Sequence, residues 1–253
     1  MVALLLICNR APRRNLSYQL ITSGLDAVTF EIGFAGLAAG DVHGDGRLDI
    51  VTIGDHGSPR VNATEAGIMV WNNNGVGTNW TLMKEGIFGY GGVALGDVNN
   101  DGIIDIGYAM HHNYGSSDLG NQLIETALGN GSGTGWVPYD DGLATNGETY
   151  GIFGIDFADV NNDGRLDLAS NSFGCCNGFR VYQNNGEGPW SPIFAKNGGN
   201  SNQWRRYGDF DNDGNADLIV ATDGTQVWSN DGAGQFASLQ NGLVLGFNTL
   251  TSL

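Results

Sequence analysis

Basic residues are scarce in this sequence: 11 Lys and Arg stand against 27 Asp and Glu, which gives a net charge of −16. Proteins that bind nucleic acids neutralise phosphates with clustered Lys and Arg, so this shortage excludes a nucleic-acid partner. It argues equally against binding to an anionic membrane surface. No apolar run approaches the roughly 18 residues that a membrane-spanning helix requires, so we expect no transmembrane segment in this chain.

Cysteine is also scarce. The three cysteines are Cys8, Cys175 and Cys176, which are too few for a disulfide framework. The adjacent pair is either two ordinary buried or turn thiols or a vicinal disulfide, which an oxidising compartment would permit. The sequence leaves both states open.

Catalytic motifs are missing as well. The sequence contains no nucleophile elbow, no P-loop and no H-E-x-x-H pair. His111 and His112 form the one cluster that could supply a base. We therefore expect a protein without enzymatic activity.

Glycine, in contrast, is abundant, with 42 of 253 residues against a usual share of about 7%. The glycines show no collagen period and lie in short turns between apolar runs. A loop of pattern D-x-[D/N/H]-x-D-G-x-x-D, with Gly at its sixth position, occurs four times. Loops 1 to 4 span residues 41–49, 97–105, 159–167 and 209–217, and hold 13 of the 27 acidic residues. Carboxylates so concentrated either repel one another or neutralise a bound cation.

Each loop lies in a larger repeat, because the loop starts are 56, 62 and 50 residues apart. A short apolar run precedes each loop, such as YGGVALG, and another follows it, such as IDIGYAM. A third run, an Asn-Gly or Asp-Gly turn and a fourth run complete the repeat. Short runs rich in β-branched and aromatic residues are typical of strands, and these turns are typical of hairpins. The repeat therefore predicts an all-β fold, a β-propeller of four-stranded antiparallel blades.

The repeat predicts a single domain over residues 1–253, with about four full blades and partial blades at both ends. The blades are expected at 34–88, 89–149, 150–200 and 201–245, and the partial blades at 1–33 and 246–253. Either the chain is a fragment of a larger propeller, or its two ends join to close a fifth blade. We favour the fragment, because the joined blade would leave strand edges unpaired.

The spacing of the four loops predicts calcium binding. Numbered from the first Asp, positions 1, 3, 5 and 9 offer side-chain ligands and position 7 offers a backbone carbonyl. Gly at position 6 permits the chain to curl around a cation that takes about 6–8 oxygen ligands, which favours calcium over zinc, copper or magnesium. The predicted ligands for about four Ca²⁺ ions are Asp41, His43, Asp45, Arg47 and Asp49 in loop 1; Asp97, Asn99, Asp101, Ile103 and Asp105 in loop 2; Asp159, Asn161, Asp163, Arg165 and Asp167 in loop 3; and Asp209, Asp211, Asp213, Asn215 and Asp217 in loop 4.

The loops have two other interpretations, an EF-hand and a turn without metal. An EF-hand requires Glu at position 12 and flanking helices. Position 12 is instead Thr52, Tyr108, Ser170 or Val220, and the flanks are strand-like. A metal-free turn is the alternative above all for loop 1, where His43 replaces an oxygen ligand. Loop 4, with four carboxylates, is expected to bind most strongly.

The loops and their strands resemble the FG-GAP/VCBS repeats of integrin-α-like β-propellers over nearly the whole chain. The segments GDVNNDGIIDI and ADVNNDGRLDL match that family's loop closely. The resemblance implies calcium between strands 1 and 2 of each blade, an extracellular or cell-surface location and roughly seven or eight blades. This chain would then be part of a longer polypeptide or assembly. The family includes adhesion modules, lectins and some polysaccharide lyases.

The strand order places the acidic loops on one face and the long connections 54–66 and 110–121 on the other. Long loops on a rigid scaffold commonly carry binding sites. The candidate ligand-binding residues are therefore His56, His111, His112 and Tyr114. We expect a calcium-stabilised, non-catalytic adhesion or interaction module that binds an extracellular protein or glycan. A carbohydrate-binding lectin, or part of a calcium-dependent polysaccharide lyase, is the alternative.

Overall fold

The computed structural model describes residues 25, 32–54, 67–75, 79–86, 91–109, 119, 124–143, 152–172, 178–197, 205–222 and 224–239. In these ranges the chain forms 16 β-strands and no helix, and hence no helix able to cross a membrane. Most of the predicted partial blade 1–33 (residues 1–24 and 26–31), and all of 246–253, lie outside the described residues.

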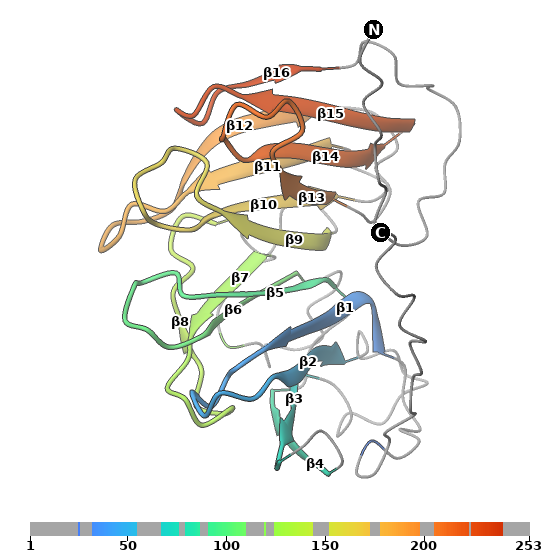
Figure 1. The fold of residues 1–253 in the computed structure, drawn as a ribbon, viewed down its shortest axis with the longest axis vertical. Coiled ribbons are helices and arrows are strands. Elements are labelled where there is room, and N and C mark those ends of the chain that lie inside the picture. Colours follow the sequence, from blue (N-terminus) through green and yellow to red (C-terminus); the bar gives the residue numbers. More distant parts are fainter. Residues whose placement is uncertain are drawn as a thin grey trace, which may run out of the picture.

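The strands form four separate four-stranded sheets, each built from consecutive strands in chain order (Figure 1). Sheet 1 contains β1 (Ile32–Gly40), β2 (Asp49–Gly54), β3 (Ile68–Asn73) and β4 (Trp80–Glu85). Sheet 2 contains β5 (Val93–Gly96), β6 (Asp105–Ala109), β7 (Ile124–Leu128) and β8 (Val137–Pro138). Sheet 3 contains β9 (Ile152–Ala158), β10 (Asp167–Ser172), β11 (Gly178–Gln183) and β12 (Ser191–Asn197). Sheet 4 contains β13 (Arg205–Gly208), β14 (Asp217–Thr222), β15 (Gly224–Asn230) and β16 (Phe236–Ser238).

The first hairpin of every sheet has the same register. In each one, the residue before the acidic loop pairs with the last Asp of that loop. The pairs are Gly40 with Asp49, Gly96 with Asp105, Ala158 with Asp167, and Gly208 with Asp217. The paired strands are antiparallel, so each acidic loop joins strands 1 and 2 of its sheet in the same way.

The sheets pack against one another in chain order, through their first strands and through apolar cores. Strand β1 contacts β5, β5 contacts β9, and β9 contacts β13. A separate core lies between each two successive sheets, and its fully buried members include Val70 and Ile106, Ile124 and Leu168, and Val181 and Leu218. Burial of each such side chain stabilises the fold by about 1.5–3 kcal/mol. A sheet therefore buries its faces only by packing on its neighbours, as repeat proteins do.

The structure confirms the all-β class and the four-stranded antiparallel sheets that the repeat predicts. The sheets lie one beyond the other, as blades do (Figure 1). Within the described ranges they do not form a closed ring. The total number of blades and the closure of a propeller therefore stay predictions.

Candidate functional site

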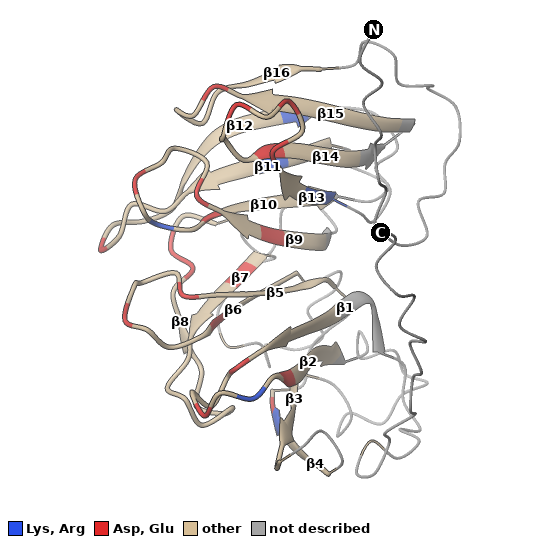
Figure 2. Ribbon diagram, in the orientation of Figure 1, with Lys and Arg blue, Asp and Glu red and all other residues tan. Residues whose placement is uncertain are grey.

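The four acidic loops are the feature that repeats in every sheet. They connect β1 to β2, β5 to β6, β9 to β10 and β13 to β14. Figure 2 shows acidic residues on each of these connections, with few basic residues nearby. Each set of predicted ligands therefore lies on one connection, at an equivalent place in each sheet.

The Asp at position 1 holds each loop in a tight curl. In loop 2, Asp97 accepts one hydrogen bond from the backbone N–H of Asp101 at 3.0 Å and another from that of Gly102 at 2.8 Å. The same two bonds recur in the other three loops, at 2.8–3.1 Å. Backbone donors thus fix the position 1 carboxylate at the centre of every loop.

Two positions of each loop take the left-handed conformation. At position 6, Gly46, Gly102, Gly164 and Gly214 have φ values of 83–93°, as expected for a backbone that doubles back. At position 4, Gly44, Asn100, Asn162 and Asn212 have φ values of 58–65°. The left-handed conformation of position 4 was not predicted from the sequence, although Gly and Asn are the residues that most readily adopt it.

The Asp at position 9 ties three parts of its sheet together. In loop 3, Asp167 Oδ2 accepts a hydrogen bond from the N–H of Val160 at 3.1 Å, and Oδ1 accepts one from the N–H of Asn184 at 2.8 Å. The other three loops repeat both bonds at 2.8–3.1 Å. These four carboxylates are 0–1% exposed. Each predicted ligand at position 9 is therefore also a buried structural anchor between strand 2, strand 3 and the loop.

Burial has an electrostatic cost at two of these anchors. Desolvation raises the pKa of Asp105 to about 6 and that of Asp167 to about 6. The carboxylates at positions 1 and 5 of the same loop raise the pKa further, whereas the two backbone N–H bonds lower it. A cation held by the loop would favour the ionised form of both groups, because it offsets this repulsion.

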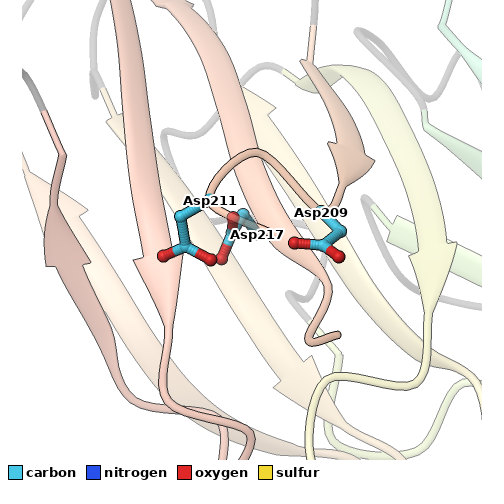
Figure 3. Close-up of side chains that lie close together, drawn as sticks. All are labelled: Asp209, Asp211 and Asp217. Atoms are coloured by element: carbon cyan, nitrogen blue, oxygen red, sulfur yellow. The ribbon is translucent and has the colours of Figure 1, made fainter. Parts of the chain in front are cut away.

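Loop 4 has the most complete set of acidic ligands. Carboxylate oxygens of Asp209, Asp211 and Asp217 all lie within 4.8 Å of one another, and Figure 3 shows the three side chains grouped around the loop. It is the one such group of His, Cys, Asp or Glu side chains found in the described part of the chain. Ser229 also donates a hydrogen bond to Asp211 at 2.8 Å. This geometry fits the prediction that loop 4 binds a cation most strongly.

Loops 1 and 3 each contain an arginine whose guanidinium pairs with a carboxylate of the same loop. This pairing was not predicted from the sequence. From the sequence, Arg47 and Arg165 were predicted to contribute only their backbone carbonyls, at position 7, as calcium ligands. In loop 3, the guanidinium of Arg165 also forms an ion pair with Asp163 at 2.5 Å and donates a hydrogen bond to the carbonyl of Asn184 at 2.9 Å. Arg47 makes the equivalent ion pair with Asp45 in loop 1. These arginines screen the position 5 carboxylates, which lowers the attraction of loops 1 and 3 for a cation.

His43 sets loop 1 apart from the others. Its Nδ1 lies 2.7 Å from Asp49 Oδ2, so the imidazole is hydrogen-bonded to a predicted ligand. Its Nε2 lies near Gly133, in the turn before β8. A Cβ added to Gly133 would lie only 3.1 Å from this nitrogen. Loop 1 therefore has three carboxylates and one imidazole, a poorer donor set for calcium than the all-oxygen sets of loops 2 to 4.

We expect the pH dependence of stability to differ in sign with and without calcium. A carboxyl whose pKa is raised by folding stabilises the folded state at pH values below its unfolded pKa, and this contribution is lost as the pH rises through its folded pKa. Without calcium, the Tm should therefore fall between about pH 4 and pH 7 as Asp105 and Asp167 ionise near pH 6. With saturating calcium, which needs ionised ligands, the Tm should rise over the same range. Melting curves in chelator and in calcium test this, and parallel pH profiles would contradict it.

The four predicted ligand-binding residues on the other face cannot be placed. His56, His111, His112 and Tyr114 lie outside the described residues. Their role stays a prediction from the sequence alone.

A cavity that the sequence analysis missed lies between sheets 2 and 3. Its volume is about 300 Å³, and three carboxylates line it: Asp140, Asp141 and Glu187. Tyr139 and Trp190 form part of its wall, in an edge-to-face contact with 6.1 Å between ring centroids. Trp190 is 3% exposed and donates a hydrogen bond to the carbonyl of Tyr139 at 2.8 Å. Tyr139 and Trp190 thus form part of the wall of a small acidic pocket that could hold a hydroxyl-rich or cationic group.

Four similar sheets, each with an acidic loop between its first and second strands, define a repeat protein built from propeller-like blades. Residues 41–108 match the family model of the FG-GAP-like repeat, so this part of the chain is similar to that repeat. The match begins at the first Asp of loop 1 and includes all of loop 2. It confirms the resemblance predicted from the sequence.

Among solved structures, the chain is similar to the V. cholerae biofilm matrix protein Bap1, with 16% sequence identity and a TM-score of 0.44. The similarity covers 82% of this chain and 30% of the Bap1 chain, so this chain spans less than a third of that protein. A comparison with curated proteins finds no match.

Proposed function

We propose that this chain is a calcium-stabilised, non-catalytic interaction module that works outside the cell or at its surface. The observation that carries the proposal is the repeated loop geometry. All four loops share the same curled backbone and the same buried anchor at position 9. A site that recurs in every sheet supports a structural role for calcium, which leaves another surface free to bind a partner.

The donor sets support calcium as the stabilising ion. Loops 2 to 4 offer only oxygen ligands, and in loop 4 three carboxylates converge within 4.8 Å. Calcium would supply positive charge at carboxylates that burial holds at a raised pKa. Extracellular calcium modules bind with Kd values of about 10⁻⁴–10⁻³ M, which suits the calcium level outside cells. The FG-GAP-like repeat at 41–108 also supports an extracellular or surface location.

Binding assays on the intact chain test this function. The chain would be applied to arrays of extracellular proteins and of glycans, with about 1 mM calcium or with EGTA, and incubated separately with pectic and other acidic polysaccharides. We expect calcium-dependent retention on a protein or glycan surface and no breakdown of polysaccharide. Calcium-dependent turnover of an acidic polysaccharide would instead establish a lyase. Equal retention in EGTA would contradict calcium stabilisation of the binding surface.

The acidic cavity favours a second candidate, a carbohydrate-binding module. Asp141 and Glu187 line the cavity and are exposed, so they could accept hydrogen bonds from sugar hydroxyls. If the cavity binds sugar, Asp141→Asn combined with Glu187→Gln should abolish glycan retention without lowering the Tm. Asp231→Asn is the control, since it removes an exposed acidic group outside the cavity and outside the four acidic loops. Loss of retention in the control alone would rule out the cavity as the sugar site.

A further inference from the structure

Two buried asparagines connect loops 3 and 4 to the acidic loop of the preceding sheet. Asn184 follows β11 and is 1% exposed. Its backbone N–H bonds to Asp167 in loop 3 at 2.8 Å, and its side-chain Nδ2 donates to the carbonyl of Val98 in loop 2 at 2.7 Å. One residue therefore touches two successive loops.

Asn230 repeats this arrangement one sheet further on. It ends β15 and is fully buried. Its backbone N–H bonds to Asp217 in loop 4 at 2.8 Å, and its Nδ2 donates to the carbonyl of Val160 in loop 3 at 2.7 Å. The same kind of link therefore joins two successive pairs of loops, 2 with 3 and 3 with 4.

The valines complete a continuous hydrogen-bonded path. The N–H of Val98 bonds to Asp105 at 2.8 Å, and the N–H of Val160 bonds to Asp167 at 3.1 Å. The path therefore runs from Asp105 through Val98 and Asn184 to Asp167. From there it continues through Val160 and Asn230 to Asp217, so it joins the position 9 ligands of loops 2, 3 and 4.

A second set of bonds follows the same route over the surface. The Nδ2 of Asn100, at position 4 of loop 2, donates to the carbonyl of Gly164 in loop 3 at 3.0 Å. The Nδ2 of Asn162, at position 4 of loop 3, donates to Asn215 Oδ1 in loop 4 at 3.0 Å. Loops 2, 3 and 4 are thus tied to one another by two independent kinds of contact.

Loop 1 has neither kind of link. Its position 4 is Gly44, which has no side chain to reach loop 2. The residue of sheet 2 equivalent to Asn184 is Gly129, whose N–H bonds to Asp105 at 2.8 Å. A Cβ at Gly129 would lie 2.2 Å from the carbonyl oxygen of Ile104, so the site admits no side chain without rearrangement.

We propose that loops 2, 3 and 4 bind calcium cooperatively, whereas loop 1 binds independently of them. The inference rests on the proposed calcium binding. An ion in loop 2 would fix Asp105 and hence Val98, which positions Asn184 to present its N–H to Asp167 in loop 3. Ordering one loop thereby lowers the cost of ordering the next, and the coupling is reciprocal. Asn184 and Asn230 act as positioning residues, since neither is a predicted ligand.

The variant Asn184→Ala removes the bond to Val98 and keeps the backbone N–H. It also removes the side-chain bonds to Leu166, Gly186 and Tyr139. Asn73→Ala is its matched control. Asn73 stands at the equivalent place in sheet 1, and its Nδ2 donates to the carbonyl of Leu48 as that of Asn184 does to Leu166, both at 3.2 Å. Asn73 does not belong to the path that joins loops 2, 3 and 4, which runs through Asn184 and Asn230. Asn100→Gly tests the surface link at an exposed position and reproduces the Gly of loop 1.

The cooperativity of calcium binding is measured by calorimetric titration of the intact chain, with calcium as the only added ligand. We expect a Hill coefficient above 1 for the wild type and the Asn73→Ala control. In Asn184→Ala and in Asn100→Gly it should fall toward 1, with about fivefold weaker binding. Independent sites in the wild type, or an equal effect of Asn73→Ala and Asn184→Ala, would overturn the inference and leave calcium binding intact. Absence of any calcium binding would overturn the proposed function itself. If Asn184→Ala does not fold, Asn100→Gly decides alone.

Discussion

Replacement of Asp167 by alanine is expected to lower the free energy of unfolding by about 2–4 kcal/mol, even in the presence of a chelator. The substitution leaves the buried N–H groups of Val160 and Asn184 without their acceptor. Each orphaned donor costs about 1–3 kcal/mol. Loss of the buried carboxylate, whose pKa is raised to about 6 by desolvation, offsets part of this cost. Urea unfolding followed by circular dichroism in EDTA measures the difference.

Asp163→Ala is the control for this prediction. Asp163 is a predicted ligand of the same loop but is exposed, and it pairs with Arg165 at the surface. Its replacement should change the free energy of unfolding by less than about 1 kcal/mol in EDTA, because exposed ion pairs contribute little. In calcium, both variants should be less stable than the wild type. Equal losses for Asp163→Ala and Asp167→Ala in EDTA would contradict the anchoring role of position 9.

Removal of calcium is expected to lower the Tm of the wild-type chain by about 5–20 °C. At about 1 mM calcium, a site with a Kd of about 10⁻⁴–10⁻³ M adds roughly 0.4–1.4 kcal/mol to the stability. Four such sites together add about 2–6 kcal/mol, and each kcal/mol shifts the Tm of a chain of this size by about 2–4 °C. The 13 carboxylates of the loops would also repel one another more strongly once the ions are gone.

Scanning calorimetry in calcium, in EDTA and in magnesium measures this effect. Magnesium at the same concentration should restore only a small part of the Tm, because it prefers to keep its water ligands. A melting curve that does not change between calcium and EDTA would rule out stabilisation by calcium.

The strands and loops could be predicted from the sequence because their signals are local. The Gly at position 6 of each loop and the Asn-Gly or Asp-Gly turn each follow from conformational limits on a few neighbouring residues. The match of residues 41–108 to the FG-GAP-like repeat rests on the same local pattern. The four-stranded sheets followed once the pattern was seen to repeat.

The connections between the loops could not be predicted, because they depend on packing. Asn184 lies in a turn that the sequence explains by its Asn-Gly pair alone, yet its side chain bonds to Val98, 86 residues away. The role of Asp167 as a buried structural anchor could not be predicted either, because a pattern of ligands does not show which carboxylate is buried. The acidic cavity at Asp141 and Glu187 needs two sheets to form it. Each of these features requires the relative placement of sheets, which no local pattern encodes.

The measurement that tests the central claim most directly is the number of calcium ions bound by each chain. Equilibrium dialysis against about 1 mM calcium, followed by elemental analysis and protein quantification, provides it. The account predicts about four ions per chain for the wild type, one for each loop, and about three after Asp209→Asn and Asp211→Asn together remove two of the three converging carboxylates of loop 4. Calcium no higher inside the dialysis chamber than outside it would contradict the account.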